Sequence, residues 1–72
     1  MGHEIHTLDV VAITSDFPDK GLLRGQVGTI VETLAPGVFE VEFSDDQGRT
    51  YAQLVIPEHQ LLLLHYQPQQ AA

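Results

Sequence analysis

Histidines have the clearest capacity for chemistry in this sequence, because imidazole is a common metal ligand and titrates near neutral pH. Two precede the first expected strand and two flank the last one: His3, His6, His59 and His65. If those two strands pair, His6 lies near His65 with Glu4 close by, and such a ligand set suits zinc or nickel. The spacing defines no ligand geometry, so we predict no metal site and no other cofactor.

Nucleophilic catalysis has no support in the residue pattern. The chain has no cysteine, and no histidine stands beside Ser15 or Ser44, as a general base would. Glu58 and His59 are adjacent, but a single turn of 3₁₀ helix directs neighbouring side chains apart. A chain this short also rarely leaves a pocket that buries a substrate. We therefore expect no catalytic residues, and we expect that the protein is not an enzyme.

Acidic side chains dominate the charge, because 10 Asp and Glu residues oppose 3 Lys and Arg residues, for a formal net charge of −7. Nucleic acids and anionic membranes both bind through Lys and Arg, so we expect neither as a partner. Several acidic residues fall in expected turns or at outward strand positions: Asp16, Asp19, Glu40, Glu42, Asp45 and Asp46. We interpret them as a solvated surface. The alternative is that they mimic phosphates toward a basic partner.

Targeting signals are missing from the sequence. The N-terminus has no basic region followed by an apolar one, so we expect no signal peptide. Uninterrupted apolar runs are no longer than Leu61–Leu64, far below the roughly 20 residues of a membrane helix. The expected location is the cytoplasm.

The elements that must position these residues are short. Turn-forming residues recur at close intervals and leave no room for an amphipathic helix of ordinary length. Strands are expected at residues 8–14, 27–34, 38–43, 49–56 and 61–65, with one turn of 3₁₀ helix at 57–60. We predict an all-β chain that forms a small five-stranded SH3-like barrel, because a closed sheet has no exposed edges.

Domain limits follow from the same pattern. The barrel is expected over residues 8–65, with a flexible N-terminus at 1–7 and a flexible C-terminal tail at 66–72.

Three local signals refine this prediction. Phe39, Val41 and Phe43 alternate with polar positions, which predicts one buried and one exposed face. Gly28 inside a strand indicates a bulge or a close backbone approach. Pro36-Gly37 and Asp45–Gly48 predict tight turns, the latter with Gly48 in the left-handed conformation.

Much of the sequence is similar to a family of short bacterial proteins whose function is unknown. The similarity is carried by Leu8–Ala12, Gly21-Leu22, Arg24–Glu32, Phe39–Phe43, Gly48–Ala52 and Leu61-Leu62. This resemblance implies an SH3-like barrel and brings no catalytic residues. Some members resemble companions of a neighbouring toxin-like or nuclease-like gene, which implies a possible antitoxin or immunity role.

A looser resemblance connects the segment from Arg24 to Val31 with KOW-type and nitrile-hydratase-accessory barrels. The KOW resemblance implies RNA contact, for which Arg24, Arg49 and Tyr51 are the candidates. The sequence departs from that pattern because the other basic residues of such a site are missing.

The run Leu61–Leu64 is the most informative feature. Side chains on a strand alternate between faces, and a closed barrel has one interior, so half of these leucines must face outward. The first strand is apolar on both faces in the same way, and we expect the two strands to be neighbours that form an outer apolar patch. The interface candidates are Val10, Ala12, Leu23, Val55, Leu62 and Leu64. The alternative is that the long first loop, with Phe17 and Leu22, folds over this patch.

We therefore expect a non-enzymatic protein-interaction module that associates with itself or docks on a larger protein. An acidic antitoxin or immunity protein that neutralises a neighbouring toxin or nuclease is the second hypothesis, and an RNA-contacting module is the third.

Overall fold

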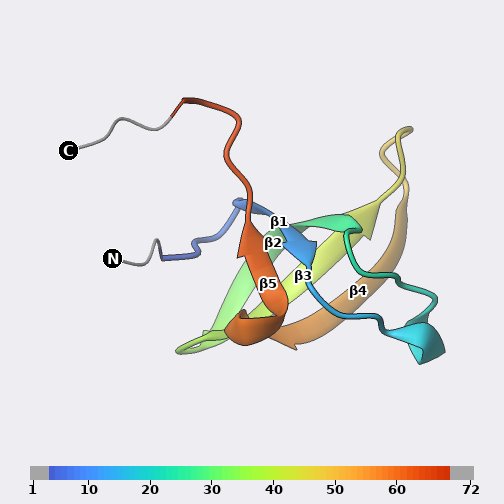
Figure 1. Ribbon diagram of the computed structural model, residues 1–72, viewed down its shortest axis with the longest axis horizontal. Helices are drawn as coiled ribbons and strands as arrows, with labels where there is room; N and C mark the ends of the chain where they lie inside the picture. Colours follow the sequence, from blue (N-terminus) through green and yellow to red (C-terminus); the bar gives the residue numbers. More distant parts are fainter. Residues whose placement is uncertain (1–3, 69–72) are drawn as a thin grey trace.

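The computed structural model describes residues 4–68, in which the chain forms one five-stranded antiparallel sheet (Figure 1). The strands are β1 (Val10–Ile13), β2 (Val27–Ala35), β3 (Val38–Ser44), β4 (Thr50–Pro57) and β5 (Leu61–Leu63). Two 3₁₀ turns are present, η1 (Pro18–Lys20) between β1 and β2 and η2 (Glu58–Gln60) between β4 and β5. The hydrogen-bonded order is β4-β3-β2-β1-β5. The predicted all-β fold, with a 3₁₀ turn before the last strand, is confirmed.

The first strand is shorter than the predicted 8–14 because the chain turns just before it. Leu8 has a φ of 77°, in the left-handed region, and the Asp9 N–H donates to the His6 carbonyl at 3.0 Å. This turn delays the start of β1 until Val10.

The 3₁₀ turn η1 was not predicted from the sequence. Pro18 begins it and Gly21, with a φ of 72°, ends it, which are the usual positions of these two residues. No helix within residues 4–68 has the length and hydrophobicity required to span a bilayer.

Side chains on the inner face of the sheet form the core. Phe39, Val41 and Phe43 are buried along β3, as their alternation predicts. Other strands contribute Val11, Ile13, Ile30, Ile56 and Leu61. Two further members come from outside the strands, Ile5 and Leu22.

The predicted flexible termini lie partly outside the described residues, which exclude 1–3 and 69–72. Within the first of these segments, Ile5 is only 9% exposed and belongs to the core cluster. One apolar residue among polar neighbours has no periodicity, so the sequence does not predict its burial.

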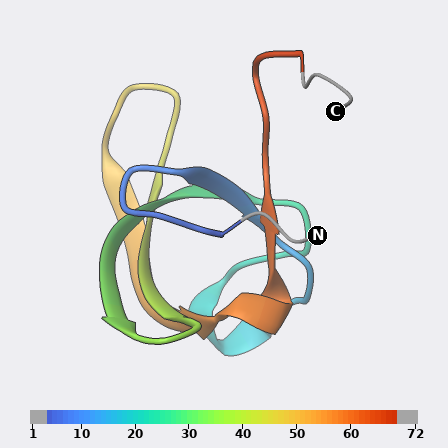
Figure 2. The same cartoon turned by 90° about the vertical axis from the view of Figure 1, so that its left-hand side faces the viewer.

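Gly28 lets β2 and β3 pack closely on the inner face. A Cβ atom at this position would lie 2.7 Å from Cγ1 of Val41 and 3.0 Å from the carbonyl oxygen of Glu42. The predicted close approach is therefore confirmed. The β2–β3 register also shifts between Ile30 and Glu32, and such irregularities help the long strands to curve around the core (Figure 2).

Both predicted hairpin turns contain a glycine in the left-handed conformation. Gly37 has a φ of 74° and Gly48 a φ of 81°. The carboxylate of Asp45 stabilises the second turn by accepting hydrogen bonds from the N–H groups of Gln47 and Arg49, both at 2.9 Å.

Candidate functional site

The outer surface of β1, β2, β5 and the residue after β5 carries a set of apolar side chains that we call the outer face: Val10, Ala12, Val27, Leu62 and Leu64. Cross-strand register explains how they come together. Ala12 lies opposite Val27 of β2 on one side and opposite Leu62 of β5 on the other. Val10 lies two residues before Ala12 on the same face of β1, and its carbonyl accepts a hydrogen bond from the Leu64 N–H at 3.0 Å. The predicted pairing of the first and last strands is therefore present.

Exposure differs within this row of residues. The side chains of Leu62 and Val27 are 55% and 47% exposed, whereas Ala12 is only 8% exposed. The methyl group of Ala12 therefore lies in a shallow strip between two larger exposed side chains. Val10 and Leu64 are partly exposed. The exposed apolar surface is carried mainly by Leu62 and Val27, although Ala12 was one of the predicted interface residues.

The leucine run divides between the two faces of β5. Leu61 is buried and Leu63 packs against the core, whereas Leu62 points outward. Alternation along a strand requires this division, but only the register with β1 decides which leucines face in.

Leu23 and Val55 were predicted to extend the patch, and the sheet register brings neither of them to the outer face. Val55 is 56% exposed on β4, opposite Glu40, and two strands separate β4 from β1 in the sheet order. Leu23 is 64% exposed in the loop between β1 and β2, where its N–H donates to Oε1 of Gln26 at 2.6 Å.

Val27 was missed among the candidates. The inward positions of Gly28 and Ile30 leave Val27 on the outer side of β2, so alternation could have found it once β2 was paired with β1.

The long loop between β1 and β2 packs on the core side of the sheet. Phe17 and Leu22 form an isolated bridge, Leu22 is fully buried, and both side chains pack in the cluster that includes Val11 and Ile13. These two loop residues therefore complete the core, and Leu62 stays exposed on the opposite surface.

His6, His59 and His65, the histidines within residues 4–68, lie in exposed positions. Nε2 of His6 lies 3.5 Å from Oε1 of Glu4, and its Nδ1 lies 3.8 Å from Oδ2 of Asp9. No group of three or more His, Asp or Glu residues within 4–68 is arranged to hold a metal ion. His3, the remaining candidate from the N-terminal segment, lies outside the described residues.

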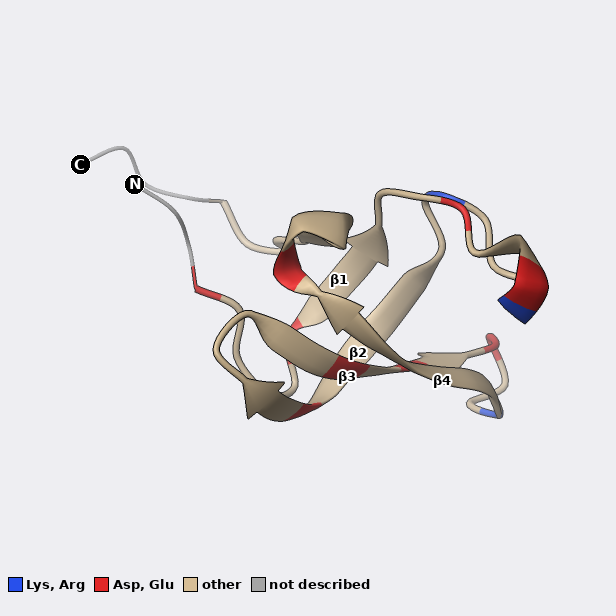
Figure 3. Ribbon diagram, turned by 90° about the horizontal axis from the view of Figure 1, so that it is seen from below, with Lys and Arg blue, Asp and Glu red and all other residues tan. Residues whose placement is uncertain are grey.

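Charge is distributed unevenly over the molecule (Figure 3). Lys20 lies in η1, Arg24 in the same loop, and Arg49 in the β3–β4 turn, all toward one end of the fold. On the outer side of β2 and β3, Glu32 lies directly opposite Glu40. Like charges in such cross-strand positions repel each other.

Sequence comparison extends this description. Residues 7–63 match a family described as a domain of unknown function, DUF4926. The chain belongs to this family. The resemblance to a small family of unknown function, expected from the sequence, is thereby confirmed. No curated protein and no solved structure matches the chain.

The match to DUF4926 includes all five strands and the outer face with the exception of Leu64. The family description assigns no activity and no site residues, so a function has to be argued from the surface itself.

Proposed function

We propose that the protein is a non-enzymatic protein-interaction module built on an SH3-like barrel, and that its docking surface is the outer face. The strand order, the long β1–β2 connection and the 3₁₀ turn before β5 support the barrel. The observation that carries the docking surface is the exposure of Leu62 and Val27 on either side of Ala12. Contiguous apolar patches on small proteins usually mark interfaces.

The occupant that we propose is a second copy of the same chain. All side chains of the outer face are uncharged, and so is Thr29, which lies opposite Val10. Two such faces can therefore meet without burying a charge, which would be costly. A two-fold arrangement would place the Leu62 side chains of both copies within one interface.

The expected association is weak. Covering a few hundred Å² of apolar surface on each copy contributes roughly 10 kcal/mol, and bringing two molecules together costs about half of that. Stable interfaces cover about 800 Å² on each partner, which is more than this strip offers. We therefore expect dissociation constants in the high micromolar range.

Sedimentation equilibrium over a range from micromolar to millimolar protein tests this proposal. The wild type should show a monomer–dimer equilibrium that Leu62→Lys abolishes. Val55→Lys is the matched control, because it changes a residue with similar exposure outside the outer face. A wild type that stays monomeric at millimolar concentration, or an equal effect of both substitutions, would contradict it.

A second candidate function is neutralisation of a basic toxin or nuclease by the acidic surface. The placement of Glu32 opposite Glu40 favours this function, because the two carboxylates repel each other and a basic partner would relieve that repulsion. Co-expression with the product of an adjacent reading frame should relieve its toxicity, and Glu32→Gln combined with Glu40→Gln should weaken this relief. Relief that is unchanged in the double variant would argue against the acidic surface.

A further inference from the structure

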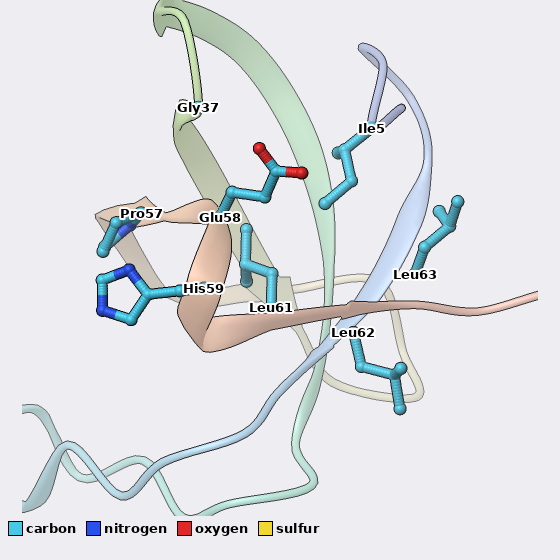
Figure 4. A pocket seen from close by; sticks show the side chains of 8 residues that line it. All are labelled: Ile5, Gly37, Pro57, Glu58, His59, Leu61, Leu62 and Leu63. Carbon is cyan, nitrogen blue, oxygen red and sulfur yellow. The ribbon is translucent and has the colours of Figure 1, made fainter. Parts of the chain in front are cut away.

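A cavity lies beside β5, and its lining includes Leu62 as well as Leu61 and Leu63, although the side chain of Leu62 points away from the other two (Figure 4). Its volume is about 610 Å³, within the range of small-ligand and peptide side-chain sites. Ile5, Leu61 and Leu63 supply apolar walls, and their side chains rise on the same side of the strand (Figure 4). Its rim includes Glu58 and His59.

A second hollow of about 270 Å³ adjoins this cavity, since Ile5, Gly37 and Glu58 line both. The carboxylate of Glu4 lines only the second hollow. The backbone between them is held in place, because the Glu58 N–H donates to the Gly37 carbonyl at 2.8 Å. Together the two hollows form a groove with an apolar floor and carboxylates along it.

The groove runs along an open strand edge, because β4 and β5 lie at the two ends of the sheet and do not pair, unlike in the closed sheet without edges that the sequence predicts. β5 is the last strand of the sheet and pairs only with β1 within the described residues. The Leu64 N–H donates to the Val10 carbonyl, and the Gln60 carbonyl accepts from Thr14, so even-numbered residues bond toward β1.

Backbone groups alternate between the two sides of an antiparallel strand. The carbonyl of Leu61 and both backbone groups of Leu63 therefore face the open edge, while the Leu61 N–H closes η2 on the Glu58 carbonyl. None of the turn and loop backbone hydrogen bonds between residues 4 and 68 uses these three groups, and within the sheet β5 pairs only with β1.

Electrostatics distinguishes between possible occupants. Glu58 takes no part in the ion pairs found among residues 4–68, which join Arg49 to Asp45 and, when His6 is protonated, His6 to Glu4 and Asp9. The Lys and Arg positions of the chain lie toward the other end of the molecule, as the blue segments of the ribbon show (Figure 3). The groove therefore offers apolar and acidic side chains but no Lys or Arg. A ligand that fits it would carry a cation next to an apolar group.

We propose that the groove binds an extended peptide segment that pairs with the edge of β5, inserts one apolar side chain against Ile5, Leu61 and Leu63, and places a Lys or Arg near Glu58. The strand geometry of the bound peptide sets the spacing between its apolar and basic residues, because residues two positions apart on a strand point to the same side. The recognised pattern is an apolar residue with a basic residue two positions away. This site shares Leu62 with the outer face, but its other lining residues lie outside that face and peptide binding does not require self-association.

The probe is a display library of random linear heptapeptides, selected against the full chain. We expect the enriched sequences to contain the pattern of apolar residue, any residue, and Lys or Arg. A blocked synthetic peptide of the leading sequence should shift the amide NMR signals of Leu61–Leu63 and Gly37. Glu58→Lys should weaken its binding at least about tenfold, and Glu58→Gln by a smaller factor.

Glu42→Lys is the matched control, since it makes the same charge change on the outer side of β3 and should alter the affinity less than about twofold. Glu58 is exposed, so the amide spectrum of each variant can confirm that it remains folded. The proposal is overturned if no peptide of this pattern is enriched, if the signals that shift are those of Val10, Ala12 and Val27 and not those of Leu61, Leu63 and Gly37, or if Glu58→Lys and Glu42→Lys act equally.

Discussion

At the scale of single residues, Gly28 and Asp45 show how local chemistry shapes the sheet. Gly28 lies where β2 passes close to β3, with Val41, Glu42 and Phe43 against the position of a Cβ atom. One of these contacts is with a backbone carbonyl, which cannot rotate away as a side chain can. Any side chain at this position must therefore push the two strands apart.

Replacing Gly28 by Ala should destabilise the protein by about 2 kcal/mol, because the added methyl group overpacks the core. Urea unfolding followed by circular dichroism measures this loss. Thr33→Ala, at an exposed position of the same strand, is the control and should cost less than about 1 kcal/mol. Equal losses of stability for the two variants would show that the close approach of β2 and β3 does not restrict the side chain at position 28.

Asp45 organises the β3–β4 turn through its carboxylate. The backbone N–H of Arg49 is the main cause that lowers the pKa of Asp45, and the Gln47 N–H and the Arg49 side chain act in the same direction. Burial opposes this shift. A carboxyl group whose pKa is lowered by folding stabilises the protein above its unfolded pKa, about 3.9.

The contribution of Asp45 should therefore be complete at neutral pH and disappear as the pH falls through its folded pKa. We expect Asp45→Asn to be clearly less stable than wild type at pH 7, and the difference to shrink below about pH 4. Chemical unfolding at several pH values measures it, with Asp46→Asn as the control in the same turn. A difference that does not change with pH would mean that the charge of Asp45 is irrelevant.

At the scale of elements, β5 shows how residues of one type, its leucines, take two different structural roles. Its leucines alternate, so that Leu61 fills the core while Leu62 is presented on the outer face. The sequence pattern alone predicts that alternate leucines face opposite sides, but it does not predict which of them face the core, because the run has no polar residue to mark the outward side. The pairing of Ala12 with Leu62 and of Ile13 with Leu61 decides it.

The two leucines should respond differently to the same substitution. Leu61→Ala should cost about 2–3 kcal/mol, because it leaves a cavity beside Ile5. Leu62→Ala should cost less than about 1 kcal/mol and weaken self-association instead. Unfolding and sedimentation measured on both variants would separate the effects. The assigned register is wrong if Leu62→Ala proves the more destabilising change.

At the scale of the whole molecule, net charge opposes the proposed association. Each copy has a formal net charge of −7, so two copies repel each other at low ionic strength. The outer face itself has no charged side chain, and the repulsion therefore acts from outside the contact, where salt screens it.

Self-association should consequently become stronger with salt. Raising sodium chloride from about 20 mM to about 500 mM should lower the dissociation constant roughly threefold to tenfold. Sedimentation equilibrium provides the measurement, and Leu62→Lys should remain monomeric under both conditions. Weaker association at high salt would indicate that ion pairs join the copies, which would contradict an apolar interface.

Strand content, the turns at Gly37 and Gly48, and the buried face of β3 could be predicted from the residues alone, because these features depend on local backbone preference and short-range alternation. The tertiary structure alone decided the burial of Ile5, the place of Leu22 in the core and the groove beside Glu58. These features join residues far apart in the chain. Their positions depend on cross-strand register and loop packing, which leave no periodic signal in the sequence.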